Sequence, residues 1–572
     1  MTHPTFPLYG YERFFAMDRG TSAKIAHVAS LRGDIPTLLQ HLPEAVLQTF
    51  NRHPKMRAVL LAGAIPQKVM ICPPLADVSE LKALFQVHEC SPDEQERAEQ
   101  ERVDVALEES PSSCSSPPIP QQKWMAFVQN ECEKPLDREK DLPFYLNLRV
   151  DTSTNTFARL VLFADHYMSD ATSGILILRE ILEIAARLSS STSPVAVVEP
   201  LPLRESLYES THYVNSWMNL VHGAVSKYVM QPLVNFDTSA FLPLLPIQVA
   251  TQQDFSSSPP NPRNPSFALF AQGSEANMRS AMARCEAEGV SLQGALIAAS
   301  TLAFGLTRHN GKLSECTEPL QLRMDVVADM RKRLMPNGDD EPLVGLYSTP
   351  GNLVFTSSEG VDPRALSFWD VARKADHEWE CVLLSHEFKM HSVFVNETLN
   401  AEQGDASGLH VANCVLSDTA IACLDYSDST PRPFPSELKV GSSLNSVNVE
   451  DLHVYSSQPS LSSTSKLFVT ALSHFNYSLM HKLEPEVAQQ LFGWLVRCTE
   501  RIGEFRQQDS LAQAGDRLAT AATTMAPEDG AAIATSEIAI QIAAADVAAV
   551  NTEESGSADS GEDGSFQQDV EC

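Results

Sequence analysis

The spacing of apolar residues divides the first half of the chain into recognisable elements. Apolar side chains recur three and four positions apart over residues 38–50 (LLQHLPEAVLQTF), which predicts an amphipathic helix. VLLAG at 59–63 predicts a strand. FYLNLRV at 144–150 and FARLVLFA at 157–164 are two further strand-like runs, and the second is almost continuously apolar, as in a strand buried on both faces. After a short polar segment, ILILREILEIAARL at 175–188 predicts another amphipathic helix.

The second half repeats this alternation of helices and strands. GVSLQGALIAASTLAFGL at 289–306 predicts a helix, and LQLRMDVVADM at 320–330 predicts a strand. Further helices are expected at 206–235, 366–384 and 484–502. Elements that alternate in this way predict an α/β fold, with helices packed on a mixed sheet in each half.

Polar segments separate the regions of regular patterning. Residues 88–121 are acidic and then rich in serine and proline, which predicts a disordered insertion. Proline, serine and asparagine dominate near 251–266, and a linker is expected at 246–266. We therefore expect an N-terminal lobe over 1–245, a C-terminal lobe over 267–506 and a disordered acidic tail over 507–572.

Composition and charge exclude several classes of protein. The 42 Lys and Arg residues against 73 Asp and Glu give a net charge of −31, which argues against nucleic-acid binding. The 11 cysteines form no CxxC pair and no zinc-spaced cluster, as in a reduced cytoplasmic protein, so no metal site is predicted. The N-terminus lacks the pattern of a secretory signal, and no run of about 18 apolar residues predicts a transmembrane segment.

The candidate chemistry lies between the apolar strand and the amphipathic helix, in ADHYMSDATSG at 164–174. This segment places His166 and Asp170 in a loop at the end of a rigid strand, where catalytic side chains are common. An imidazole there can accept a proton from an attacking hydroxyl or amine. The pattern H-x-x-x-D alone is expected about once by chance in a chain of this length, so by itself it favours a structural histidine.

The surrounding sequence resembles one superfamily in the correct order. Residues 164–174 resemble the HHxxxDG motif of the acyltransferases with the chloramphenicol-acetyltransferase fold, which include condensation domains, alcohol acetyltransferases and polyketide-associated acyltransferases. LPEAVLQTFNRHPKMRAVL at 42–60 and PLDREKDLPFYLNLRV at 135–150 resemble the segments that precede this motif. GVSLQGALIAAS at 289–300 and DMRKRLMP at 329–336 resemble segments of the second half. The resemblance extends over about residues 8–505.

This resemblance implies a fold and a role for each motif residue. It implies two lobes with an active-site tunnel between them, and His166 as general base. The aspartate of the motif, Asp170, would support the loop by pairing with an arginine, for which Arg331 is the better positional match and Arg333 the second candidate. Two positions depart from the motif. Asp165 replaces its first histidine, and Ala171 replaces its glycine, which would strain the backbone if a left-handed conformation were needed there.

The implied reaction moves an acyl group from a thioester to an alcohol or amine, with acyl-CoA as co-substrate and no bound cofactor. The sequence contains no G-x-S-x-G elbow of a serine hydrolase and no phosphate-binding loop for ATP. Three hypotheses remain open: an acyl-CoA-dependent O-acyltransferase, a condensation enzyme that receives its acyl group from a separate carrier protein, and a non-catalytic homologue that binds an acyl ligand or a partner. Thiol release from acyl-CoA distinguishes the first from the other two.

Overall fold

The computed structural model of the chain describes most of the two predicted lobes. The described residues are 3–17, 23–64, 67–90, 123–151, 154–190, 199–210, 242–248, 267–334, 342–384, 417–426, 434, 438–440, 446–457, 463–524 and 541–543. The predicted linker at 246–266 lies almost entirely outside them. Of the helix predicted at 206–235, only α6 (Leu207–Ser210) falls within them.

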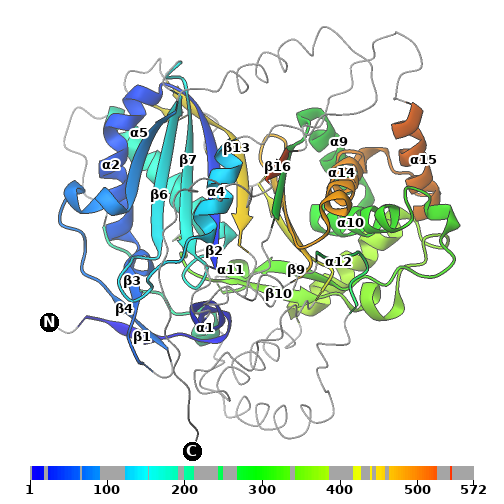
Figure 1. The fold of residues 1–572 in the computed structure, drawn as a ribbon, viewed down its shortest axis with the longest axis horizontal. Coiled ribbons are helices and arrows are strands. Elements are labelled where there is room, and N and C mark those ends of the chain that lie inside the picture. The colour runs from blue at the N-terminus through cyan, green and yellow to red at the C-terminus, as the bar shows by residue number, and fades with distance from the viewer. Residues whose placement is uncertain are drawn as a thin grey trace, which may run out of the picture.

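A six-stranded sheet forms the first lobe, in the order β12-β13-β2-β7-β6-β5 (Figure 1). Its neighbours run antiparallel except β5 and β6, which are parallel. Helices α2 and α5 pack on each other over one face, and α4 packs on the other, which explains the continuous apolar run of β7. The bounds are β2 (Lys24–Gly33), α2 (Ile35–Arg52), β5 (Phe85–Cys90), α4 (Lys123–Glu133), β6 (Phe144–Asp151), β7 (Phe157–Asp165), α5 (Ala171–Ser190), β12 (Leu438–Lys439) and β13 (Ser446–Ser456).

A seven-stranded sheet forms the second lobe, in the order β10-β9-β11-β14-β15-β8-β16. It is mixed, because β11 runs parallel to β9 and to β14 while the other pairs are antiparallel. The bounds are β8 (Phe267–Gln272), α9 (Glu275–Glu288), α10 (Leu292–Arg308), β9 (Met324–Asp329), β10 (Ser348–Asn352), α12 (Phe368–Leu384), β11 (Thr419–Asp425), β14 (Ser465–Ala471), β15 (Phe475–His481), α14 (Pro485–Glu500), α15 (Leu511–Thr524) and β16 (Gln541–Ala543).

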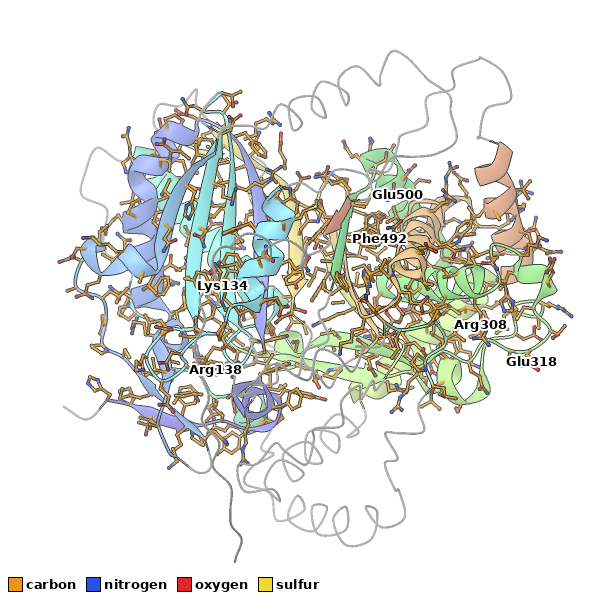
Figure 2. All side chains as sticks on the ribbon, in the orientation of Figure 1. Lys134, Arg138, Arg308, Glu318, Phe492 and Glu500 are labelled. Carbon is orange, nitrogen blue, oxygen red and sulfur yellow. The ribbon has the colours of Figure 1, made fainter. Side chains whose placement is uncertain are left out.

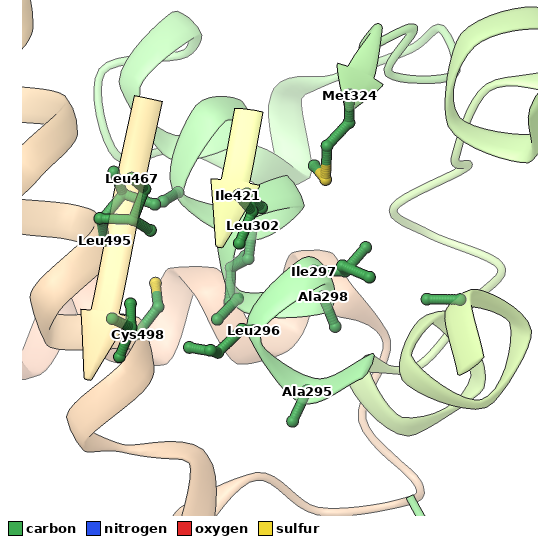
Figure 3. Packing of buried hydrophobic residues seen from close by; sticks show 14 of the residues in the cluster. Ala295, Leu296, Ile297, Ala298, Leu302, Met324, Ile421, Leu467, Leu495 and Cys498 are labelled. Carbon is green, nitrogen blue, oxygen red and sulfur yellow. The ribbon is translucent and has the colours of Figure 1, made fainter. Parts of the chain in front are cut away.

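Helix α10 is the centre of the second core. Its residues from Leu292 to Thr307 are almost all buried, and it packs against α12 and α14 (Figure 3). Leu296, Ile297 and Leu302 lie there with Leu467 of β14 and Leu495 of α14. Small residues along α10, including Ala295 and Ala298, allow its neighbours to approach closely.

Smaller elements lie around both sheets, and β1, β3 and β4 lie below the sheet of the first lobe in Figure 1. A three-stranded sheet has the order β1-β4-β3. Short helices complete the described chain. The bounds are β1 (Thr5–Pro7), α1 (Gly10–Met17), η1 (Pro54–Arg57), β3 (Ala58–Leu60), β4 (Lys68–Ile71), η2 (Val78–Ala83), η6 (Leu313–Glu315), α11 (Arg331–Leu334), η7 (Phe355–Glu359) and η9 (Ile502–Glu504).

The two lobes exchange structure across the predicted division of the chain. Strands β12 and β13 come after the linker in sequence, yet they extend the sheet of the first lobe, with β13 paired to β2. Phe270 of β8 and Phe468 of β14 also belong to the hydrophobic core of the first lobe. The ring of Trp124, from α4, lies 5.2 Å from that of Phe270. The lobes are therefore joined by a continuous apolar contact.

Two predicted boundaries need correction. The tail expected to be disordered from 507 is ordered over Leu511–Thr524, where α15 packs on the second core and buries Leu511, Ala512 and Ala514. The insertion expected at 88–121 also begins too early, because β5 continues to Cys90 and pairs with β6. In both places an edge of ordered structure carries few large apolar residues, so composition alone resembles a solvated segment.

The described helices include none that could cross a membrane alone. The adjacent helices α9 and α10 are long and apolar enough only when they are counted together, and they are bent by 107° at the break between them.

Candidate active site

The loop that carries His166 begins where β7 ends. Asp165, the last residue of β7, pairs with Lys24 of β2, and the backbone N–H of His166 donates to the carbonyl of Ala23 at 2.6 Å. The loop ends at Asp170, whose carboxylate accepts the N–H of Ser173 at 2.8 Å in the first turn of α5. An aspartate that accepts this bond caps the helix, so hydrogen bonds hold both ends of the loop.

The imidazole of His166 is held in one orientation. Its Nδ1 lies 2.8 Å from the carbonyl oxygen of Ser169, which can only accept, so Nδ1 carries the proton. The ring of Phe15, from α1, stacks on it with centroids 4.2 Å apart and planes 10° apart. Nε2 has no hydrogen-bond partner among the described residues. This nitrogen is also not completely covered by the surrounding atoms. The nitrogen that could accept a proton is therefore the one left open.

The surroundings of His166 keep it neutral. Its side chain is 7 % exposed, and burial, followed by the nearby charge of Lys466, lowers its pKa to about 4. A hydrogen bond to Ser169 and the charge of Asp170 act in the opposite direction, with less effect. At neutral pH the imidazole therefore has a free lone pair on Nε2.

Asp170 and Arg331 form a buried, two-pronged ion pair. Nη1 and Nη2 of Arg331 lie 3.0 and 2.9 Å from the two carboxylate oxygens of Asp170. The backbone N–H groups of Ser173 and Tyr347, each at 2.8 Å, bind the same carboxylate. Burial alone would raise the pKa of Asp170, but Arg331 and these N–H donors outweigh it and hold the pKa below its usual value.

The ion pair directs the carboxylate of Asp170 away from the imidazole of His166 and connects the loop to Arg331 of the second lobe. Arg331 also bonds Asp329 at 2.9 Å and the hydroxyl of Ser173 at 2.7 Å. The side chain of Arg333, the second candidate, lies outside the described residues. The carboxylate of Asp170 bonds Arg331, Ser173 and Tyr347 and not the imidazole of His166, in contrast to the aspartate of a serine-protease triad.

A second ion pair, which sequence reasoning missed, lies on the other side of His166. Nε of Arg138 is 2.7 Å from Asp165, and Nη2 is 3.3 Å from the other carboxylate oxygen (Figure 2 labels Arg138). Nη1 donates at 3.3 Å to the carbonyl of Ala16, which links this pair to the helix that carries Phe15. Asp165 is 1 % exposed and burial raises its pKa, which the guanidinium counteracts.

The signal for this pair was present in the sequence. A carboxylate at the motif's first-histidine position becomes buried, because the preceding strand is apolar on both faces, and a buried carboxylate needs a cation. Arg138 occurs in the PLDREK stretch before β6. Asp165 thus contributes to holding the loop, and its replacement of a histidine leaves no unpaired charge.

Ala171 adopts ordinary helical geometry as the first residue of α5. Among the described residues, the non-glycine positions with positive φ are Asn155 and Asn310, so no left-handed strain exists at Ala171. The close approach occurs three residues later. A Cβ added to Gly174 would lie 2.0 Å from the ring of His27, whose Nε2 bonds the carbonyl of Ala171 at 2.8 Å. The glycine that this packing requires is therefore Gly174.

Comparison with known proteins identifies the fold. No protein-family model matches the chain, and no curated protein sequence matches it. Solved structures, in contrast, match the chain. The first condensation domain of the calcium-dependent antibiotic synthetase has a TM-score of 0.58 at 14 % identity, over 89 % of this chain and 98 % of that one. TRI3 trichothecene 15-O-acetyltransferase from Fusarium sporotrichioides has a TM-score of 0.59 at 10 % identity, over 87 % and 95 %.

The condensation domain of the monacolin K polyketide synthase MokA is also similar, with a TM-score of 0.55 at 11 % identity over 89 % and 99 % of the two chains. The predicted fold class is thus confirmed: the chain has the two-lobed α/β fold of chloramphenicol-acetyltransferase-like enzymes. At these identities the likeness concerns the fold, and the chemistry must be argued from the site.

The site offers one open base held by a rigid frame. Within the part of the chain that the structure describes, no group of three or more His, Cys, Asp or Glu side chains could hold a metal ion. Phe15, Arg138 and Lys466 are the neighbours of the loop that sequence reasoning did not identify. Between them, the two ion pairs fix the backbone on either side of His166.

Proposed function

We propose that this protein is an acyltransferase that moves an acyl group from a thioester to an alcohol hydroxyl or an amine, with His166 as general base. One observation carries the proposal: the Nδ1–H of His166 is bound to the carbonyl of Ser169, and Nε2 is left open and unprotonated. A neutral imidazole fixed in this tautomer is prepared to accept a proton from a nucleophile. The shared fold with a trichothecene O-acetyltransferase and with condensation domains supports the same chemistry.

The reaction follows from this geometry in two proton transfers. Nε2 of His166 accepts the proton of the acceptor as its oxygen or nitrogen attacks the thioester carbonyl. A tetrahedral oxyanion forms, and the C–S bond then breaks as the carbonyl is restored. Protonated His166 returns its proton to the leaving thiolate, which departs as a thiol. The site requires no covalent enzyme intermediate.

We propose acyl-CoA as the donor and a small molecule as the acceptor, with the site at a tunnel between the lobes. A condensation reaction with a carrier-bound acyl group is the second candidate, because two of the similar structures are condensation domains. Two observations speak against the non-catalytic alternative. The backbone at Ala171 is unstrained, and the charge at Asp165 is paired with Arg138.

Thiol release and mass spectrometry of the products test the function directly. The full chain is incubated with acetyl-, butyryl- and octanoyl-CoA, and with the same acyl groups on the phosphopantetheine of a carrier protein, against a panel of alcohols and amines. Release of CoA with formation of an ester or amide supports the CoA-dependent reaction. Products from the carrier-bound donors alone support condensation. Absence of acylated product with every donor would contradict the enzymatic proposal.

A further inference from the structure

Lys466 occupies an unusual position in β14. The side chains of this strand alternate: Leu467 and Val469 belong to the core of the second lobe, and Phe468 belongs to that of the first. Lys466 has the same parity as Phe468, and it is paired across the sheet with Met480, which is fully buried in the first core. A lysine therefore stands in an apolar stripe that faces the first lobe.

The ammonium group of Lys466 lies in the region of His166. Nζ donates to Oγ of Ser456 at 3.0 Å, at the end of β13. Ser456 pairs with Ile25, and Ile25 pairs with Ala164, two residues before His166. Partners across a sheet present their side chains on one face, so Ser456 and Ala164 share a face. The charge of Lys466 acts on His166 and lowers its pKa, consistent with this proximity.

Among the described residues, no carboxylate forms an ion pair with Lys466. Arg138 and Arg331, two other cations close to the loop, each hold a carboxylate. Within the described ranges, Nζ of Lys466 bonds only the neutral hydroxyl of Ser456 and lies 4.9 Å from the centre of the Phe468 ring.

Two of the three N–H donors of Lys466 are thus without a partner in the described chain, while its side chain remains partly exposed. Burial lowers the pKa of Lys466 to about 8, so that it still carries its charge at neutral pH. A charged group that stands in an apolar stripe, with no counter-charge among the described residues, departs from the pattern of the strand, and such departures commonly mark a functional site.

We propose that Lys466 binds a carboxylate of the substrate, carried either by the acceptor or by the far end of the acyl group. The inference rests on the proposed function in assigning the bound carboxylate to a substrate. The carboxylate would accept the two unused N–H bonds. The phosphates of CoA do not fit this role, because they lie at the opposite end of the pantetheine arm from the thioester that must meet His166.

Binding of this carboxylate would also act on the base. The positive charge of Lys466 disfavours protonation of His166. A carboxylate that neutralises this charge would make His166 a stronger base once the substrate is in place. Lys466 would thus select a substrate that carries a carboxylate, and binding of that substrate would make His166 accept a proton more readily.

The test measures binding in a His166→Ala background, in which acyl transfer should not consume the ligands. Isothermal titration compares succinyl-CoA with butyryl-CoA for the acyl source, and 3-hydroxybutyrate with its methyl ester for the acceptor source. In one of the two pairs, the ligand that carries the carboxylate should bind more tightly than its neutral partner, by about 10-fold or more. A hydrogen bond between charged groups typically gives a difference of this size. Lys466→Met should abolish this preference, and Lys466→Arg should retain most of it.

Lys482→Met is the control, because it removes the charge of a buried lysine one residue beyond the end of β15, and it should keep the preference. Near-ultraviolet circular dichroism checks the folding of each variant, with Lys466→Gln as a substitute if Lys466→Met does not fold. The proposal is overturned if Lys466→Met leaves both ligand ratios within about twofold of the parent, or if the parent has no preference in either pair.

A third result would also contradict the proposal. If, with His166 present, Lys466→Met slowed the reaction of charged and neutral ligands equally, the ammonium would act on the reaction centre in general. Failure of the proposed function is seen separately, as absence of thiol release with every donor, and the binding ratios can still be measured in that case.

Discussion

The ion pair between Asp170 and Arg331 should be one of the most sensitive points of the structure. In Asp170→Asn the shape is retained and the negative charge is lost, so Arg331, with a side chain 11 % exposed, loses its more buried partner. Removal of one partner from a buried pair costs about 3–5 kcal/mol. Because Asp329 still contacts Arg331 at 2.9 Å, we expect a loss near the lower end, about 3 kcal/mol.

Thermal unfolding followed by circular dichroism measures this loss. For a folding unit the size of one lobe, in the range of about 150–250 residues, a loss of 1 kcal/mol in the free energy of unfolding lowers the Tm by about 2–4 °C. Asp170→Asn should therefore lower the Tm by about 6–12 °C. Glu183→Gln is the matched control. It removes a carboxylate from the pair with Arg179 on α5, where the side chains are 37 % and 30 % exposed. Such a surface pair contributes about 0.5 kcal/mol or less, so this variant should melt within about 2 °C of the parent.

Equal stability losses in the two variants would mean that burial and the four bonds to Asp170 do not strengthen this pair. A loss in Asp170→Asn that disappeared at high salt would also contradict it, because screening acts mainly on exposed pairs.

Three further predictions concern stability. First, burial holds the pKa of four histidines at about 4, against a usual value of 6.5, namely His27, His166, His453 and His481. The unfolded chain binds more protons at these four sites between the two values, and together they outweigh Glu12 and Asp418, whose pKa values are raised to about 7 and about 6 and act in the opposite direction. The Tm should therefore be highest above pH 6.5 and fall as the pH is lowered toward 4; a Tm that is constant over this range would contradict the assignment. Second, Leu511→Ala, at a fully buried position of α15, should cost about 2–5 kcal/mol, and truncation after Arg506 should cost more, as measured by chemical denaturation; unchanged stability of the truncated chain would mean that α15 does not contribute. Third, Gly174→Ala should destabilise the protein by about 1–3 kcal/mol because its Cβ meets His27, whereas Ala171→Gly should change stability by less than about 1 kcal/mol; the reverse order would place the required glycine at 171.

Local patterns were sufficient to predict much of the fold. The strand at β7, the loop after it and the helix α5 follow from apolar periodicity, which reports which face of an element is buried. The pairing of β13 with β2 could not be predicted in this way. Those strands are about 420 residues apart in sequence, and no local pattern indicates which distant strand a segment will join.

The frame of the candidate site was only partly visible in the sequence. Family resemblance singled out His166, Asp170 and Arg331, and the structure brings these residues together. Arg138 and Lys466 were missed, because their importance depends on what lies across the sheet from them. Helix α15 was missed for a different reason. Its small residues resemble a solvated tail, although Gly515 is small enough to pack against Leu302 of α10.

The role of His166 is tested most directly by comparing the rate of acyl transfer in the parent chain and in His166→Ala, with the thioester that the parent uses best. Loss of a general base should lower kcat by about 10²- to 10⁴-fold while the Tm stays within a few degrees. His88→Ala is the control, because it removes a partly exposed histidine from β5 of the same sheet and should leave the rate unchanged. A His166→Ala variant that folds and retains the parent's rate would show that Nε2 of His166 does not accept the proton.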